Sequence, residues 1–135
     1  MDDFCASIDK HLIQLERSVI ARWHERVEDD YSKNPFLDSE ILKVDEKHKE
    51  KYLKGERIEA AYGSTLIAVA CTDAFWFGIH IGDGKCITCD YRGNFAEPIP
   101  WDEKCFLNVT TSISDSNAID NFVIYIPKVC REHYL

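Results

Sequence analysis

The sequence predicts an α+β fold in which two helices precede a meander of antiparallel strands. Up to about residue 31, apolar residues recur at spacings of three and four, which is the pattern of an amphipathic helix. From Gly63 onward the chain changes to short apolar and aromatic runs separated by glycine and aspartate turns, which is typical of consecutive antiparallel strands. The 135 residues show no repeat and no linker. We therefore expect a single domain over 1–135, with a helical part over 1–57 and a mainly β part over 62–126.

The first helix is expected from about residue 3 to about residue 31. Glu16 and other charged residues are expected on its remaining faces. Asn34-Pro35 should end the helix, because the residue before a proline avoids the α region. The apolar stripe that the spacing predicts consists of Ile8, Leu12, Leu15, Val19, Trp23, Val27 and Tyr31.

A second helix should begin at Asp38-Ser39-Glu40, whose acidic first turn suits the helix dipole. The charge-dense stretch over 45–54 could be a basic docking patch or a solvated helical face. Its acids alternate with its bases, which favours the solvated face. Gly55 marks the end of this stretch.

The β part is predicted as a meander of three strands followed by less regular chain. Turns are expected at Thr72-Asp73, Gly82-Asp83-Gly84 and Arg92-Gly93-Asn94, because glycine and aspartate are typical of tight turns. The predicted segments are strands over 66–71, 75–81 and 85–90, an extended segment over 105–112, a short helix near 115–118 and an apolar segment over 122–126.

Composition excludes several classes of protein. Lysine and arginine number 16 against 24 aspartates and glutamates, giving a net charge of −8, which argues against a sequence-independent nucleic-acid binder. The N-terminus has no basic start followed by an apolar run, and no apolar stretch is long enough to span a bilayer. We therefore expect a cytoplasmic protein without a nucleic-acid or membrane partner, and its six cysteines are expected as reduced thiols.

Cys86-Ile87-Thr88-Cys89 is a C-x-x-C motif, a pattern found in zinc and redox sites. Zinc sites usually need a second pair of ligands, and a redox motif opens a helix, whereas this motif falls in the predicted third strand. Two residues three apart on a strand point to opposite faces. The spacing therefore favours a structural interpretation over a metal or redox site.

Two further polar residues lie where the second strand is expected to end. His80 is interpreted as a polar position on a half-exposed strand rather than as a functional group. Asp83 lies in a tight turn at the end of a sheet, where oxygen ligands for Mg²⁺ or Mn²⁺ are often placed, and Gly82 and Gly84 would let a metal approach. Asp-Gly is also a common hairpin turn, and the spacing alone favours that structural interpretation.

Gly63-Ser64-Thr65 enters one predicted strand, and Gly82-Asp83-Gly84 ends the next strand. Four more segments accompany these motifs: Arg22-Trp23-His24-Glu25-Arg26-Val27, Asn34-Pro35-Phe36, Ile99-Pro100-Trp101-Asp102 and Thr110-Thr111-Ser112. Over roughly 4–122 the ordered set resembles the protein phosphatase 2C (PPM) family, and the four further segments resemble a bacterial subgroup of these phosphatases.

The resemblance implies a metal-dependent protein serine/threonine phosphatase that acts on phosphoproteins. It implies a β-sandwich of two antiparallel sheets with helix pairs outside, in which the first helix and the helix that begins at Asp38 form a helix pair packed on one antiparallel sheet. It also implies two Mn²⁺ or Mg²⁺ ions that activate a water. By residue, it implies a peripheral metal ligand at Asp83 and a structural motif at Gly63, Ser64, Thr65, Gly82 and Gly84. No catalytic residue is assigned.

The chain also departs from the family pattern. The family's first metal aspartate precedes the first helix and has no counterpart here, and the stretch after Phe122 does not resemble the family's continuation. We therefore expect a central part of the domain, truncated at both ends and inactive alone. The alternatives are a non-catalytic pseudophosphatase or protein-binding module, and a homo-oligomer that covers an exposed sheet face.

The predicted core joins the first helix to the second strand. Trp23 and Val27 are expected to pack against the face of that strand formed by residues 75, 77 and 79. Trp76, on the opposite face, is expected to be exposed in a monomer.

Overall fold

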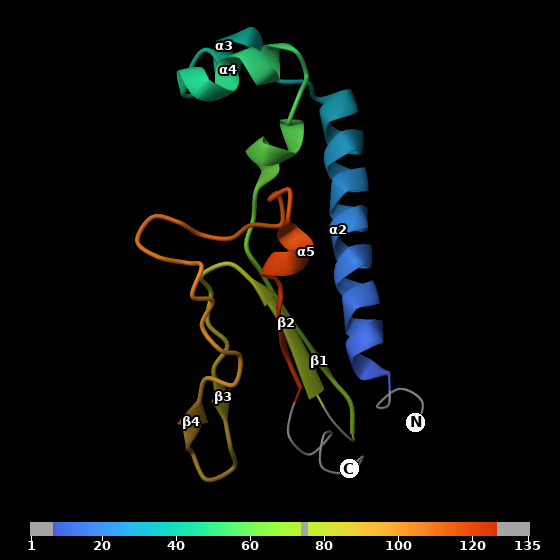
Figure 1. Cartoon of the computed structure of the whole chain (residues 1–135), viewed down its shortest axis with the longest axis vertical. Coiled ribbons are helices and arrows are strands. Elements are labelled where there is room, and N and C mark those ends of the chain that lie inside the picture. Colours follow the sequence, from blue (N-terminus) through green and yellow to red (C-terminus); the bar gives the residue numbers. More distant parts are fainter. Residues whose placement is uncertain (1–6, 74–75, 127–135) are drawn as a thin grey trace.

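The computed structural model describes residues 7–73 and 76–126 (Figure 1). It is a mixed α+β structure with two main helices and two small antiparallel sheets. The helices are α2 (Ile8–Lys33), α3 (Asp38–Ile41), α4 (Glu46–Leu53), the 3-10 helix η1 (Ile58–Tyr62) and α5 (Ala118–Asn121). The strands are β1 (Leu66–Cys71), β2 (Trp76–Ile81), β3 (Thr88–Cys89), β4 (Phe95–Ala96) and β5 (Val123–Tyr125).

The larger sheet has the order β1-β2-β5, and both pairs of strands are antiparallel. Its register runs from Leu66 opposite Ile81 to Cys71 opposite Trp76, and Gly78 lies opposite Tyr125. The first predicted strand is confirmed, and the second is confirmed over its described residues.

The predicted third strand is wrong in length and in partner. Only Thr88–Cys89 is extended, and it pairs with Phe95–Ala96 in a separate two-stranded sheet. Two long-range features explain this: Gly82 donates its N–H to the hydroxyl of Thr111, which directs the chain away from β2, and β5 occupies the free edge of β2. The extended segment expected over 105–112 is reduced to one isolated bridge between Phe106 and Val109.

The long helix α2 lies alongside the larger sheet, with α5 close to its middle (Figure 1). Its end at Lys33 is two residues later than expected, and its expected start lies outside the described residues. Leu12 and Val27 are buried, but Leu15 is 38% exposed. Glu16, expected on a solvated face, is only 2% exposed, because it lies one helical turn from Leu12 on the same stripe.

The second helical segment does not form a pair with α2 on the sheet. The helices α3 and α4 lie beyond the far end of α2, away from β1 and β2 (Figure 1). The predicted start at Asp38 is confirmed, and the carboxylate of Glu40 accepts the N–H of Leu37 at 2.9 Å. The charge-dense stretch forms α4, where Lys49 pairs with Glu46 and Lys54 with Glu50 on the surface.

An aromatic cluster joins this helical end to the rest of the chain. The ring of Phe36 lies 5.0 Å from the ring of Tyr31, 5.5 Å from that of Tyr52 and 6.0 Å from that of Tyr62, measured between centroids. The hydroxyl of Tyr62 donates to Asp30 at 2.9 Å. Phe36 therefore connects the end of α2, α4 and η1.

On the larger sheet the structure differs from the prediction at Trp76. Val27 and Ile79 are buried and Trp23 and Phe77 are half-buried, whereas residue 75 lies outside the described residues. Trp76 is not fully exposed, because its ring packs against that of Tyr125 at 4.7 Å between centroids.

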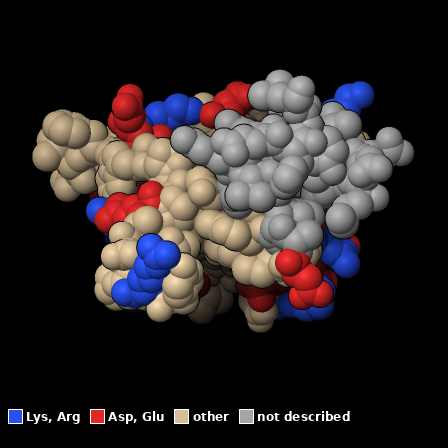
Figure 2. Space-filling model, turned by 90° about the horizontal axis from the view of Figure 1, so that it is seen from below, with Lys and Arg blue, Asp and Glu red and all other residues tan. Residues whose placement is uncertain are grey.

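No helix in the described part of the chain is long and apolar enough to cross a membrane. Figure 2 views the molecule from the lower end of Figure 1, where acidic and basic side chains of the described residues lie among uncharged ones.

Candidate functional site

The Gly82-Asp83-Gly84 turn lies at the end of β2, beside the residues that lead into β1. Gly82 has φ 111°, a conformation that side chains rarely adopt, and a Cβ there would collide with the side chain of Thr65. A Cβ on Gly84 would lie 2.8 Å from Cδ1 of Ile67. Both glycines therefore allow the turn to pack directly against the start of β1.

A buried polar network holds this turn in place. The N–H of Gly82 donates to Oγ1 of Thr111 at 2.9 Å, and the same hydroxyl donates to Oδ2 of Asp102 at 2.8 Å. The backbone N–H of Lys104 donates to the other carboxylate oxygen of Asp102 at 3.0 Å. The thiol of Cys105 lies 3.6 Å from both Asp102 and Thr111. Two segments that resemble the phosphatase family, Trp101-Asp102 and Thr110-Thr111, therefore meet here.

Asp102 is an ionised acceptor at the centre of this network. It is 5% exposed. Burial by itself would raise its pKa, but hydrogen bonds from Lys104 N–H and the Thr111 hydroxyl outweigh burial, so the pKa of Asp102 is lowered from its ordinary value. Its carboxylate is therefore already occupied by protein donors.

The Gly63-Ser64-Thr65 motif makes a second set of contacts with the same loop. The backbone N–H of Ser64 donates to Oγ of Ser112 at 3.0 Å, and the carbonyl of Ser64 accepts the N–H of Ile113 at 3.0 Å. The hydroxyl of Ser64 donates to the carbonyl of Thr65 at 2.9 Å. A Cβ on Gly63 would lie 2.9 Å from Oγ of Ser114. These contacts join the motif to the loop that contains Ser112, Ile113 and Ser114.

The sequence interpretation did not predict the burial of His80, which is 2% exposed rather than half-exposed. Ile99 packs over the neighbouring Gly78 on the same face of β2, where Cδ1 of Ile99 would lie 2.8 Å from a Cβ on Gly78. Among the described residues Nε2 of His80 has no hydrogen-bond partner, and it would lie 3.8 Å from a Cβ on Gly84. Burial lowers the pKa of His80, and the nearby carboxylates of Asp102 and Asp83 oppose that effect. His80 is therefore a neutral imidazole beneath the turn.

The described residues do not fit a two-metal centre. Asp83 is exposed and offers carboxylate oxygens, which suit Mg²⁺ and Mn²⁺. No group of three or more histidine, cysteine, aspartate or glutamate residues in the described part of the chain is placed to hold a metal ion. The charges of Asp102 and Asp83 both act on His80. The carboxylate of Asp102, however, already accepts hydrogen bonds from the Thr111 hydroxyl and the Lys104 N–H.

The C-x-x-C motif is not closed into a disulfide. Cys86 lies outside β3 and Cys89 lies within it, and both are free thiols, as are Cys71 and Cys105. Two of the six cysteines, Cys5 and Cys130, lie outside the described residues.

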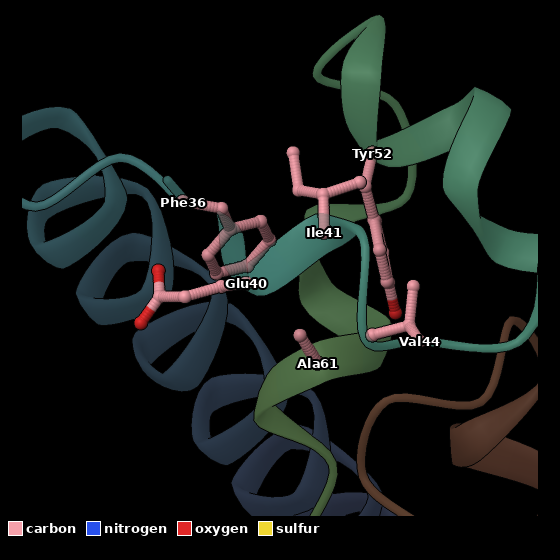
Figure 3. Close-up of a pocket in the computed structure, with 6 residues that line it drawn as sticks. All are labelled: Phe36, Glu40, Ile41, Val44, Tyr52 and Ala61. Carbon is pink, nitrogen blue, oxygen red and sulfur yellow. The ribbon is translucent and has the colours of Figure 1, made fainter. Parts of the chain in front are cut away.

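A separate apolar pocket of about 210 Å³ lies among α3, α4 and η1, far from the turn at the end of β2. Figure 3 shows the rings of Phe36 and Tyr52 on its walls, with Ile41 and Ala61 between them and Val44 beside the hydroxyl end of Tyr52. Glu40 lines it too, but its carboxylate caps the N–H of Leu37. The pocket therefore offers apolar contact and no free charged group from these lining residues.

Comparison with known proteins identifies the family. The model of the family described as "Protein phosphatase 2C" matches residues 1–132 of the 135-residue chain. A search of curated proteins and a search of solved structures each found no match. The family match covers every segment that contributes to the turn and its network. The chain belongs to the protein phosphatase 2C family.

Proposed function

We propose that this chain supplies the central part of a metal-dependent protein serine/threonine phosphatase domain, and that it is inactive alone. The observation that carries the proposal is the family match over residues 1–132. The contacts between Gly63-Ser64-Thr65, Gly82 and Thr111 support it, because residues that resemble the family at distant positions pack on one another. The complete domain would hydrolyse phosphate monoesters of phosphoproteins and would have the β-sandwich that the resemblance implies.

The inactivity rests on the number of carboxylates. Hydrolysis by two metal ions requires several oxygen ligands to hold both ions a few ångströms apart. Asp83 can supply one ligand, and the nearby carboxylate of Asp102 is held by the turn network. We propose that Asp83 is a peripheral ligand of Mn²⁺ or Mg²⁺, and that the chain by itself does not assemble the catalytic pair.

The alternative function is a non-catalytic pseudophosphatase or protein-binding module. This alternative is supported because two hydroxyls of the motifs form hydrogen bonds within the protein. Ser64 donates to a backbone carbonyl, and Thr111 donates to Asp102. Such a module would bind a phosphoprotein, or a second copy through an exposed sheet face, without turnover. In either case we propose a cytoplasmic location, with the cysteines reduced.

Mn²⁺-dependent hydrolysis of p-nitrophenyl phosphate by the purified full chain tests the proposal. We expect no turnover that a chelator abolishes. Turnover that is lost with chelator and in Asp83→Asn, but kept in the matched exposed variant Asp73→Asn, would contradict the proposed inactivity.

Titration of Mn²⁺ followed by its electron paramagnetic resonance signal tests the metal ligand separately. We expect weak binding at one site, in the millimolar range typical of sites with few protein carboxylates, that is lost in Asp83→Asn and kept in Asp73→Asn. Equal binding by both variants would place the metal elsewhere. Binding of a phosphothreonine peptide without release of phosphate would favour the pseudophosphatase alternative.

A fluorophosphonate probe tests the structural role of Ser64. We expect no labelling, because the Ser64 hydroxyl is directed to the carbonyl of Thr65 and a nucleophilic serine needs an adjacent base. Labelling that disappears in Ser64→Ala would show that this hydroxyl is activated.

A further inference from the structure

The strand β1 lies at one edge of the larger sheet. In the described part of the chain it pairs with β2 on one side only, in the order β1-β2-β5. In an antiparallel pair, alternate residues direct both their N–H and C=O groups away from the partner strand. Half of the six residues of Leu66–Cys71 therefore direct backbone donors and acceptors to this edge, where residues 7–73 and 76–126 supply no strand to pair with them.

The side chains of β1 leave this edge unprotected. Protein sheets usually protect an edge strand with a lysine, a proline, a bulge or a very short strand. The β1 sequence is Leu-Ile-Ala-Val-Ala-Cys, which contains none of these residues and no charge, and its register with β2 runs unbroken through all six residues. Its last four residues are exposed although all are apolar, and Val69 is 46% exposed because it lies opposite Gly78, which has no side chain.

We propose that β1 pairs antiparallel with β1 of a second copy of this chain. An antiparallel edge is self-complementary under a two-fold axis, because each residue of one strand can face a residue of the other and receive the same contact in return. The uncharged strand brings no like-charge pair into contact, although each chain carries a net charge of −8. Pairing would join two three-stranded sheets into one of six strands, which is a common sheet size.

The size of the contact sets its strength. Six residues extend about 20 Å, and the pair would exchange about six backbone hydrogen bonds. Two paired strands of this length bury much less surface than the roughly 1,000 Å² of a stable interface. The dimer should therefore be weak, and its population should depend on protein concentration. Screening of the net negative charge by salt should strengthen it. This surface is independent of the proposed phosphatase function, because the pairing uses no residue of the turn network.

Sedimentation velocity of the full chain from about 5 to about 200 µM tests the pairing, since a weak dimer populates with concentration. We expect a shift from monomer to dimer in the wild type, and monomer throughout in Val69→Lys, where a charge enters the edge. Val109→Lys makes the same change at a loop residue that is 62% exposed, and it should dimerise as the wild type does. A monomer at all concentrations, or a dimer that Val69→Lys leaves intact, would overturn the proposal.

Hydrogen exchange of the wild-type backbone amides tests the pairing without a variant, and so it applies even if Val69→Lys fails to fold. Alternate amides of β1 should become protected as the concentration rises, because they gain partners across the new edge. Protection confined to any other segment would overturn the proposal, as would large assemblies without protection in β1.

Discussion

The buried carboxyl group of Glu16 should make the stability of this protein fall as the pH rises. Glu16 lies on the apolar stripe of α2 and is 2% exposed, and no group in the described part of the chain forms a hydrogen bond with its Oε1. Burial raises its pKa from 4.5 to about 7. The folded state therefore keeps the proton to a higher pH than the unfolded chain does.

The sign follows from proton binding. Between pH 4.5 and about 7 the folded chain holds a proton at Glu16 that the unfolded chain has released, so the free energy of unfolding decreases through this window. Each unit of pKa difference corresponds to about 1.36 kcal/mol, which gives an upper limit of about 3 kcal/mol. Replacing Glu16 by glutamine keeps the shape of the side chain and removes the ionisation.

Urea unfolding followed by circular dichroism at about pH 5 and about pH 8 measures the effect. We expect Glu16→Gln to match the wild type near pH 5 and to be more stable by up to about 3 kcal/mol near pH 8. His80 makes stability rise with pH instead, because burial lowers its pKa and folding opposes its protonation. Since His80 is present in both proteins, the contribution of Glu16 is measured as the difference in the free energy of unfolding between variant and wild type at each pH.

Glu28→Gln is the matched control, since Glu28 is exposed on the same helix. Its stability relative to the wild type should not change with pH. If Glu16→Gln differs from the wild type by the same amount at both pH values, Glu16 does not ionise within this window and the argument from burial fails.

The turn at the end of β2 provides the remaining predictions. Gly82→Ala should lower the free energy of unfolding by about 2 to 4 kcal/mol, because its φ of 111° and its contact with Thr65 both exclude a Cβ. The control Gly93→Ala, at φ 83° with nothing within 4 Å of a Cβ, should lower it by about 1 kcal/mol. Equal losses in urea unfolding would refute the role of the contact with Thr65. Thr111→Val should lower the free energy of unfolding by about 1 to 3 kcal/mol, because the Gly82 N–H and the Asp102 carboxylate lose the Thr111 hydroxyl as a partner. Thr111→Ser keeps a hydroxyl and should retain most of the wild-type stability. A Thr111→Val protein as stable as the wild type would show that this network does not contribute to stability.

Local patterns in the sequence determined the elements that depend on neighbouring residues. The apolar run over 66–71 and the aromatic run that follows predicted β1 and β2, because strand length and β-branched composition are local properties. The acidic turn at Asp38 predicted the start of α3, and Gly55, at φ 67°, ends the helical stretch. The family was also evident from motifs read in order along the chain.

Only the tertiary structure decided which strands pair and which polar residues are buried. The second partner of β2, after β1, is β5, about forty residues later in the sequence. No pattern within 85–90 could show that β5 occupies this edge of β2. Glu16 was expected on a solvated face of the helix and His80 on a half-exposed strand, because polar residues usually contact water, yet both are 2% exposed. Burial depends on segments that are distant in sequence, and a local pattern contains no information about which of them will cover a given face.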